Sequence, residues 1–363
     1  MKSRVRTDRQ TPDGLEQRLL TRARAAGFAA GDRIVVGFSG GRDSLALAAG
    51  LRWVRSSLNV EPVLVHIDHR LRPSSSEEAK HAANLAASLN LEFQAVAISA
   101  PPTVTHPGVG MEEAARRERY RRLFGVASRC GASAVATAHH RDDQAETVLL
   151  HLLRGGGVHG AAAMAECSPS PFPESGPPRD ISRENLKTGA RAWLWRPLLS
   201  ESREVITAYV AKLGVAPIED PSNSDTALRR NALRHELLPA LESYFPGAAA
   251  ALARYAALAA EDDRALQALA IPALREGVDP GGRLAVASLR EQPPAIQRRM
   301  IRGWLEDATD GSWLSAERTE AVLLLARSGR GGAALEIGDG WTVCLESGML
   351  RTERTASSRE ESS

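Results

Sequence analysis

The strongest constraint on the fold is an alternation of short apolar runs with longer helical segments in the first half of the chain. The apolar runs have the length of buried strands and occupy Arg33–Phe38, Pro62–Asp68, Glu92–Ile98 and Ala132–Ala136. Helical periodicity follows each run in turn, over Asp43–Ser56, Ser74–Leu89, Met111–Cys130 and Asp142–Leu153. Strands that alternate with helices predict a parallel sheet with helices on both faces. We therefore expect an α/β fold built on a Rossmann-like sheet.

The length of 363 residues and the hydrophobic content of 43% are sufficient for two domains. Residues 1–28 are expected to hold an N-terminal helix, with Thr11 as its N-cap and Pro12 at its first position. Residues 29–217 are expected to form the α/β domain. Within it, residues 168–180 are rich in Pro, Ser and Gly and predict an exposed flexible loop.

A change in composition after residue 217 predicts the second domain. Alanine and leucine dominate there, and strand signals are lacking until Ala333–Leu345. Residues 218–353 are therefore expected to form a mostly helical domain closed by a small β-hairpin. The polar residues 354–363 predict a disordered tail.

Composition excludes several classes of protein. The formal net charge of +2 permits a nucleic-acid partner without demanding one. Cys130, Cys167 and Cys344 lie far apart, which predicts reduced thiols rather than a disulfide framework or a zinc site. The N-terminal residues lack the apolar core of a secretory signal, and no apolar run reaches the ~20 residues that span a bilayer. These features predict a soluble, cytoplasmic protein without a membrane partner.

A glycine-rich segment directly follows the first predicted strand and opens the first predicted helix. It comprises Ser39, Gly40, Gly41, Arg42, Asp43 and Ser44. Glycines allow the backbone to approach a phosphate, and a helix N-terminus favours an anion. The Gly-Lys-Ser/Thr of the P-loop NTPases and the Rossmann Gly-x-Gly-x-x-Gly do not occur here. A carboxylate beside phosphate implies Mg²⁺, with Asp43 as its ligand. The alternative is that Asp43 only favours the helix N-terminus and the glycines only turn the chain.

The segment Ser39–Ser44 (SGGRDS) resembles the phosphate loop of the N-type ATP pyrophosphatases, whose fold is adenine nucleotide alpha hydrolase-like. Four further segments occur in the order found in the tRNA(Ile)-lysidine synthetase family and are similar to its motifs. They are Val65–Pro73, Gly110–Tyr120, Ala138–Thr147 and Glu219–Arg234. The resemblance covers roughly residues 33–239 with strong motifs, and the helical region beyond more weakly.

The resemblance implies a ligase that forms lysidine at the wobble cytidine of the isoleucine tRNA with a CAU anticodon. In that reaction the cytidine 2-oxygen attacks the α-phosphate of ATP and releases pyrophosphate. The ε-amine of L-lysine then attacks carbon 2 and expels AMP. ATP is thus the expected co-substrate and Mg²⁺ the expected metal, while the oligomeric state stays open. Longer members of the family carry a further C-terminal domain. How this chain would bind the acceptor arm of the tRNA is therefore left open by the resemblance.

The resemblance also implies roles for residues outside the glycine-rich segment. His66 lies at the carboxyl end of the second predicted strand and His139 follows the fourth, and both are implied to line the nucleotide site; the alternative for His66 is that it caps its strand and orients Arg72. Arg116 shares a helix face with Glu112, a spacing that by itself favours a solvated salt bridge. The resemblance implies instead that Arg116 neutralises charge on the α-phosphate. Arg116, Asp43 and Asp143 are the expected catalytic residues.

Two carboxylates and two arginines complete the predicted site. Asp143 and Glu146 are three residues apart at a helix start, and the resemblance implies that they recognise lysine; the alternative is helix capping by Asp143. Arg230 and Arg234 are one turn apart and are implied to contact tRNA, whereas spacing alone favours a solvated face. The attacking amine has a reference pKa of about 10.4 and must lose a proton, which either Asp43 or Asp143 could accept. An arginine cluster at Arg298–Arg302 is expected to extend the tRNA path onto the second domain.

Two rival functions must be distinguished from this one. A tRNA thiolase with the same loop would need reactive cysteines or an iron–sulfur Cys-x-x-Cys, neither of which this chain offers. In a binding module that senses adenine nucleotides, Asp43, Arg116 and the paired carboxylates would have no functional role. Pyrophosphate release that depends on lysine and tRNA would distinguish an enzyme from such a module.

Overall fold

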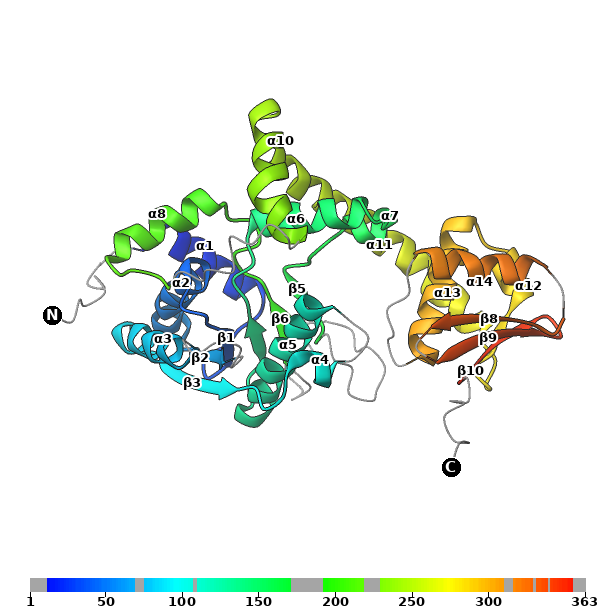
Figure 1. Cartoon of the computed structure of the whole chain (residues 1–363), viewed down its shortest axis with the longest axis horizontal. Helices are drawn as coiled ribbons and strands as arrows, with labels where there is room; N and C mark the ends of the chain where they lie inside the picture. The colour runs from blue at the N-terminus through cyan, green and yellow to red at the C-terminus, as the bar shows by residue number, and fades with distance from the viewer. Residues whose placement is uncertain are drawn as a thin grey trace. The chain divides into compact units, whose positions relative to one another are not determined.

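The computed structural model describes residues 12–68, 75–106, 110–170, 192–218, 229–309, 316–328, 331–338 and 340–354, and the statements below concern these residues. The chain divides into two compact units (Figure 1). The first unit comprises residues 1–147 and 164–253, and the second comprises residues 148–163 and 254–363. Of the segment expected in the second domain, residues 229–253 therefore lie in the first unit. The physical reason is that Arg230 and Arg234 form ion pairs with carboxylates of that unit.

The described part of the first unit contains a six-stranded sheet in the order β3-β2-β1-β4-β6-β5. Its strands are β1 (Arg33–Gly37), β2 (Glu61–Asp68), β3 (Glu92–Ala97), β4 (Ala134–Ala136), β5 (Cys167–Ser168) and β6 (Trp193–Trp195). β1, β2, β3 and β4 pair in parallel, as predicted; β6 extends the parallel sheet beside β4, and β5 adds an antiparallel edge that the sequence did not suggest. Cys167 and Ser168 of β5 pair with Trp195 and Leu194, so the chain is already ordered at the start of the expected loop. Of that loop, residues 171–180 lie outside the described residues.

Helices flank both faces of this sheet. α2 (Arg42–Leu58) and α3 (Ser75–Leu89) pack on one face and α5 (Met111–Cys130) on the other. The described part of the unit also contains α1 (Gly14–Ala25), α4 (Pro102–Thr105), α6 (Arg141–Leu152), α8 (Arg203–Leu213), α9 (Arg229–Ala232), a π-helix (Leu233–Leu237) and α10 (Leu238–Tyr244). α6 runs on into the second unit by its last residues. Before residue 218, the sequence did not predict α4, β5 or the short helix at Gly157–Ala161, whereas β1–β4 and the helices α2, α3, α5 and α6 match the predicted ranges to within a few residues.

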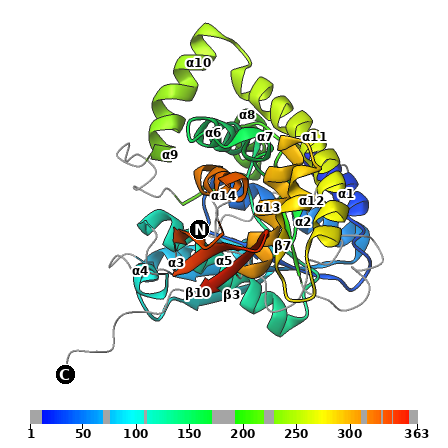
Figure 2. The ribbon, with the colours of Figure 1, turned by 90° about the vertical axis from the view of Figure 1, so that its right-hand side faces the viewer.

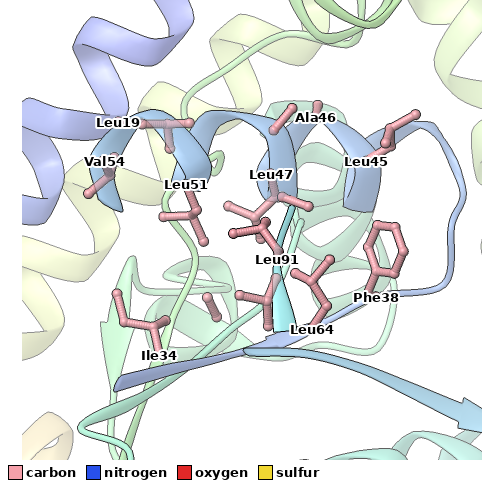
Figure 3. Packing of buried hydrophobic residues seen from close by; sticks show 14 of the residues in the cluster. Leu19, Ile34, Phe38, Leu45, Ala46, Leu47, Leu51, Val54, Leu64 and Leu91 are labelled. Carbon is pink, nitrogen blue, oxygen red and sulfur yellow. The ribbon is translucent and has the colours of Figure 1, made fainter. Parts of the chain in front are cut away.

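Side-chain alternation along the strands builds one core on each face of the sheet. Ile34 and Val36 of β1 join the core under α1, α2, α3 and α8, whereas Val35 joins the core under α5. Figure 3 shows that the leucine side chains of α2 point toward Ile34 and Leu64 of the sheet. Both cores are fully buried at their centres, and burial of each leucine-sized side chain contributes about 1.5–3 kcal/mol. This double burial explains why the strands read as continuous apolar runs rather than alternating ones.

The N-terminal helix begins later than predicted. Asp13, not Thr11, is the N-cap: its side chain accepts from Leu15 N, and Glu16 bonds back to Asp13 N at 2.6 Å. Thr11 itself lies outside the described residues. A capping box satisfies two backbone donors at once, which the Thr-Pro pair would not do. Glu16 also accepts a hydrogen bond from Tyr209 at 2.8 Å and so ties α1 to α8.

The second unit combines helices with a larger sheet than the predicted hairpin. Its elements are α7 (Gly157–Ala161), most of α11 (Ala248–Gly277), β7 (Leu284–Ala285), α12 (Val286–Arg290), α13 (Pro294–Ala308), α14 (Ala316–Ser328), β8 (Ala333–Gly338), β9 (Trp341–Glu346) and β10 (Met349–Arg354). The strands pair antiparallel in the order β7-β10-β9-β8. Met300, Trp304 and Leu305 of α13 belong to the core that this sheet shares with α14. Figure 2 shows α13 and α14 beside the strands of this sheet. Residues 355–363, expected to be disordered, lie outside the described residues.

The predicted arginine cluster of the second unit is occupied by local ion pairs. Arg298 pairs with Glu320 at 2.8 Å, Arg299 with Asp263 at 2.7 Å, and Arg302 with Glu306 at 2.8 Å. The Arg299 side chain is only 14% exposed. A phosphate at these positions would have to compete with a carboxylate for each guanidinium.

None of the helices in the described part of the chain combines the length and the apolar character needed to cross a bilayer.

Candidate active site

The predicted site residues follow neighbouring parallel strands. β1 lies between β2 and β4, which are connected in opposite directions along the sheet, so the strand order reverses there. Open α/β sheets bind ligands at the carboxyl ends of the strands beside such a reversal. The glycine-rich segment follows β1, His66 lies near the end of β2, and His139 follows β4. The topology therefore brings together residues that lie up to a hundred positions apart.

The glycine-rich segment forms a tight turn between β1 and α2. Gly40 has a φ of +79°, a left-handed conformation that favours glycine, and Gly41 is the N-cap of α2. The Ser39 hydroxyl accepts from Gly41 N at 3.3 Å and lies 3.1 Å from the Ser44 hydroxyl. The carbonyl of Gly40 accepts a bond from Ile218 N at 2.9 Å. This geometry presents the amino end of a 17-residue helix, which favours an anionic group.

Arg42 and Asp43 point to different partners. Arg42 Nη1 donates to the Thr207 hydroxyl at 3.0 Å, so its side chain is directed to α8, and only its backbone remains for a nucleotide. The carboxylate of Asp43 is 41% exposed and lies 3.7 Å from His140 Nε2.

His140 is a site residue that the sequence reasoning missed. Its side chain is 1% exposed, and Nε2 lies 3.5 Å from the Asp143 carboxylate and 3.7 Å from that of Asp43. Because Asp142 N donates to His140 Nδ1 at 3.2 Å, the neutral ring carries its proton on Nε2, toward the two carboxylates. His140 thus links the glycine-rich segment to Asp143. The only signal in the sequence was the doublet His139-His140.

His66 and His139 have fixed orientations. His66 Nδ1 lies 3.1 Å from the carbonyl of Phe38, and the ring is buried. His139 Nδ1 lies 2.9 Å from the Thr137 hydroxyl. Burial lowers the pKa of His139 to about 3, so this ring is neutral at physiological pH. A neutral ring offers one hydrogen-bond donor without adding charge.

The two predicted lysine-binding carboxylates are held by the two predicted tRNA-binding arginines. Glu146 is completely buried and accepts from Arg234 Nε at 2.7 Å and from Arg230 Nε at 2.9 Å. Arg234 Nη2 reaches Asp143 Oδ1 at 2.6 Å. The structure therefore brings all four residues into one cluster instead of placing the arginines on an open helix face. The Arg230 side chain is 27% exposed and the Arg234 side chain 21% exposed, so both arginines keep some access to solvent.

Asp143 is held in its charged form. Burial alone would raise its pKa, but electrostatic interaction with the neighbouring histidines and with the guanidinium groups of Arg230 and Arg234 brings the pKa down to about 2. His140 N also donates to Asp143 Oδ2 at 2.9 Å. Such a carboxylate holds a cation well and accepts a proton poorly at neutral pH.

Arg116 pairs with Glu113 rather than with Glu112. Its Nε and Nη2 donate to the two Glu113 oxygens at 2.8 and 3.1 Å, and its guanidinium lies 5.7 Å from the centre of the Tyr120 ring. Burial would lower the pKa of Arg116, but the Glu113 carboxylate keeps that pKa above its ordinary value. The salt-bridge alternative is thus realised, and the side chain still remains 43% exposed.

The donor set fits a magnesium ion held mainly by phosphate. Among the described residues, no group of three or more His, Cys, Asp or Glu side chains is arranged as a metal site. Mg²⁺ in nucleotide sites is commonly bound by one or two carboxylates together with phosphate oxygens and water. Asp43, half-exposed beside the helix terminus, supplies one such carboxylate.

The fold and the loop define the class of protein. A family model described as "PP-loop domain" matches residues 15–241, and one described as "TilS substrate binding domain" matches residues 284–351. A solved structure of the U34-tRNA thiolase NcsA from Methanococcus maripaludis with its [4Fe-4S] cluster superimposes with a TM-score of 0.53. It covers 68% of this chain and 78% of its own at 16% identity, a likeness of fold alone.

The relatives define the family more narrowly. A tRNA(Ile)-lysidine synthase from Salinispora arenicola is 38% identical over 321 residues, which cover 87% of this chain and 89% of the relative. Another, from Geobacter sulfurreducens, is 38% identical over 280 residues, and the match spans 55% of that longer protein. The chain belongs to the tRNA(Ile)-lysidine synthase family.

Proposed function

We propose that the protein uses ATP to join L-lysine to the wobble cytidine of the isoleucine tRNA with a CAU anticodon. The observation that carries this proposal is the line of polar groups from Asp43 through His140 to Asp143 and Glu146. It connects a phosphate-binding helix terminus to a pair of buried carboxylates. A site of this kind can hold a nucleotide and a cationic amino acid side by side. Since the substrate is a tRNA, the reaction belongs in the cytoplasm.

The first step is adenylation of the cytidine. Backbone amides at Gly41 and the amino end of α2 bind the released pyrophosphate, and Arg116 neutralises charge on the α-phosphate. Mg²⁺, held by Asp43, would supply further positive charge to the phosphates. His66 and His139 fix the walls of the nucleotide site through their bonds to Phe38 and Thr137.

The second step requires lysine to reach the carboxylate pair. An ammonium group of lysine can contact Asp143 and Glu146 only if Arg230 and Arg234 give up part of their bonds to them. Backbone phosphates of the tRNA compete for the same guanidinium groups. We therefore propose that tRNA binding draws the arginines toward phosphate and so admits lysine.

The attacking amine must also lose a proton. With a pKa of about 2, Asp143 is a weak proton acceptor, so its role is to hold charge. Asp43 is the better-placed acceptor of the two candidates, because its carboxylate is 41% exposed whereas that of Asp143 is 11% exposed and held by arginine.

The direct test combines the protein with ATP, radiolabelled lysine and a transcript of the isoleucine tRNA. We expect pyrophosphate release that needs both lysine and tRNA, and a digested nucleoside with the mass of lysidine. Asp43→Asn is the matched inactive control, and a transcript with a methionine acceptor stem tests tRNA choice. ATP binding without any lysine- or tRNA-dependent pyrophosphate release would show a nucleotide-binding module instead.

A further inference from the structure

Arg196 occupies an unusual position for a charged residue. It directly follows β6, and only 9% of it is exposed. Its Nη1 donates to the Ala165 carbonyl at 2.7 Å and to the Ser168 hydroxyl at 3.2 Å, whereas Nε is buried without a partner. Within the described ranges, no carboxylate lies within ion-pair distance of Arg196. Buried guanidinium groups are normally paired with an anion, because an unpaired buried charge is costly.

A second unpaired guanidinium lies nearby on α5. Arg119 also has no ion-pair partner in the described part of the chain. Although Arg119 is exposed, desolvation by the surrounding protein lowers its pKa, and the positive charges of Arg116 and Arg230 add to that effect, while Tyr120 and Glu112 oppose it only in part. Arg116 differs from it, because Glu113 neutralises Arg116.

The sheet register places these groups at one edge. β4 and β6 are parallel neighbours with Ala136 opposite Trp195, so Arg196 and Thr137 leave the sheet side by side. Thr137 N donates to the Trp195 carbonyl at 2.9 Å, and the Thr137 hydroxyl holds His139. Burial is the main cause of the low pKa of His139, and the charges of Arg196, Arg230 and Arg119 depress it further. Positive charge from α5, α9 and the end of β6 therefore converges on His139.

A purely structural role explains only part of this arrangement. The bonds from Arg196 to Ala165 and Ser168 anchor the start of the segment after β5. They do not explain why Arg119, on a different element, also lacks an ion pair among the described residues. A site for an anion explains both.

We propose that Arg119 and Arg196, together with His139, form a phosphate-binding subsite beyond the one formed by the glycine-rich segment and Arg116. The subsite deepens the proposed function, on which it rests. The ligand is a phosphate group, and either the nucleotide or the RNA backbone beside the target cytidine can supply it. Two guanidinium groups from different elements can contact different oxygens of one phosphate, while the His139 N–H donates to a third.

The experiment uses Arg119→Gln, Arg196→Met and Arg196→Lys in the full chain, with Arg129→Gln as control. Arg129 lies exposed in the last turn of the same helix as Arg119. Affinity is measured separately for a non-hydrolysable ATP analogue and for the tRNA transcript, the latter across a salt series. Thermal melting monitors folding, and Arg119→Gln keeps the test valid if the buried Arg196→Met variant is unstable.

Each outcome decides the proposal. If the phosphate belongs to the nucleotide, Arg119→Gln and Arg196→Met lower the affinity for the ATP analogue by about tenfold to hundredfold and leave the affinity for tRNA unchanged. If the phosphate belongs to the RNA backbone, the two variants lower the affinity for tRNA, and the slope of log affinity against log salt concentration becomes shallower by about 0.7 per lost contact. In either case Arg196→Lys restores part of the loss, and Arg129→Gln has no effect. Folded variants that bind both ligands like the wild type overturn the subsite. A wild-type protein that forms no lysidine would refute the proposed function separately, since the binding measurements do not depend on turnover.

Discussion

Replacing Arg234 by glutamine tests whether this arginine competes with lysine for the carboxylate pair. Arg234 makes three charge-assisted bonds, at 2.7 and 3.1 Å to Glu146 and at 2.6 Å to Asp143. Glutamine removes the positive charge, while Arg230 stays 2.9 Å from Glu146. If lysine must displace this arginine, the variant binds lysine more tightly in the absence of tRNA. A net gain equal to one charge-assisted bond, about 1.5–3 kcal/mol, would lower the Kd of lysine roughly tenfold to hundredfold.

The same change should lower the stability of the first unit. Breaking a buried ion pair costs about 3–5 kcal/mol, but Arg234 is 21% exposed and Arg230 remains, so about 1–3 kcal/mol is expected here. For a unit of this size that loss lowers Tm by roughly 2–12 °C. Stability and lysine affinity therefore change in opposite directions, which is the signature of the competition.

The assay is calorimetric titration of lysine into the protein with a non-hydrolysable ATP analogue and no tRNA, together with thermal melting. Arg203→Gln is the matched control, because Arg203 Nη2 lies 3.9 Å from Glu146 and its stronger contact is to Asp142 at 3.2 Å. Arg234→Gln that is folded but binds lysine no more tightly than the wild type would refute the reasoning. Arg234 would then support the carboxylates rather than occupy them.

Three further changes test the loop, the catalytic carboxylate and the packing of α5. Gly40→Ala combines a φ of +79° with a steric collision, so nucleotide affinity should fall more than tenfold, as measured by titration of an ATP analogue. Asp43→Asn should retain the Tm of the wild type but lose most lysidine formation, and full turnover would exclude both its magnesium and its proton role. Burial raises the pKa of Glu118, but two arginines on its own helix outweigh burial and hold the pKa at about 2, so Glu118 stabilises the fold above about pH 4.5 and loses that effect as the pH falls. Glu118→Gln should therefore lower the free energy of unfolding by up to about 3 kcal/mol at pH 7, which is measured as a lower Tm. The difference in Tm between the variant and the wild type should disappear near pH 2–3.

Local patterns were sufficient to predict most of the fold. Continuous apolar runs such as Arg33–Phe38 identified the parallel strands because each strand is buried on both faces. The two-residue strand β5 and the π-helix at Leu233–Leu237 escaped prediction, since neither has enough residues to show a period. β10 escaped because residues such as Arg351 and Glu353 interrupt any apolar run, although Leu350 is buried.

The site was predicted residue by residue but not as a set of contacts. The pairing of Arg230 with Glu146 joins positions 84 residues apart, and no local spacing encodes such a contact. His140 could have been suspected from its neighbour His139, but its position between Asp43 and Asp143 follows only from the packing of α6 against the glycine-rich turn. The roles assigned to these residues in binding ATP, lysine and tRNA remain predictions.

The bond from Ile218 N to the Gly40 carbonyl has a consequence for the protein during its synthesis. The two residues are separated by most of the first unit, so a growing chain makes Gly40 long before it makes its partner. At about 5–20 residues per second, a ribosome needs roughly 10–40 s to cover that interval. Throughout that time the turn lacks this restraint, and we expect the nascent chain to bind nucleotide poorly. Acquisition of ATP binding is thereby tied to completion of the unit that uses it.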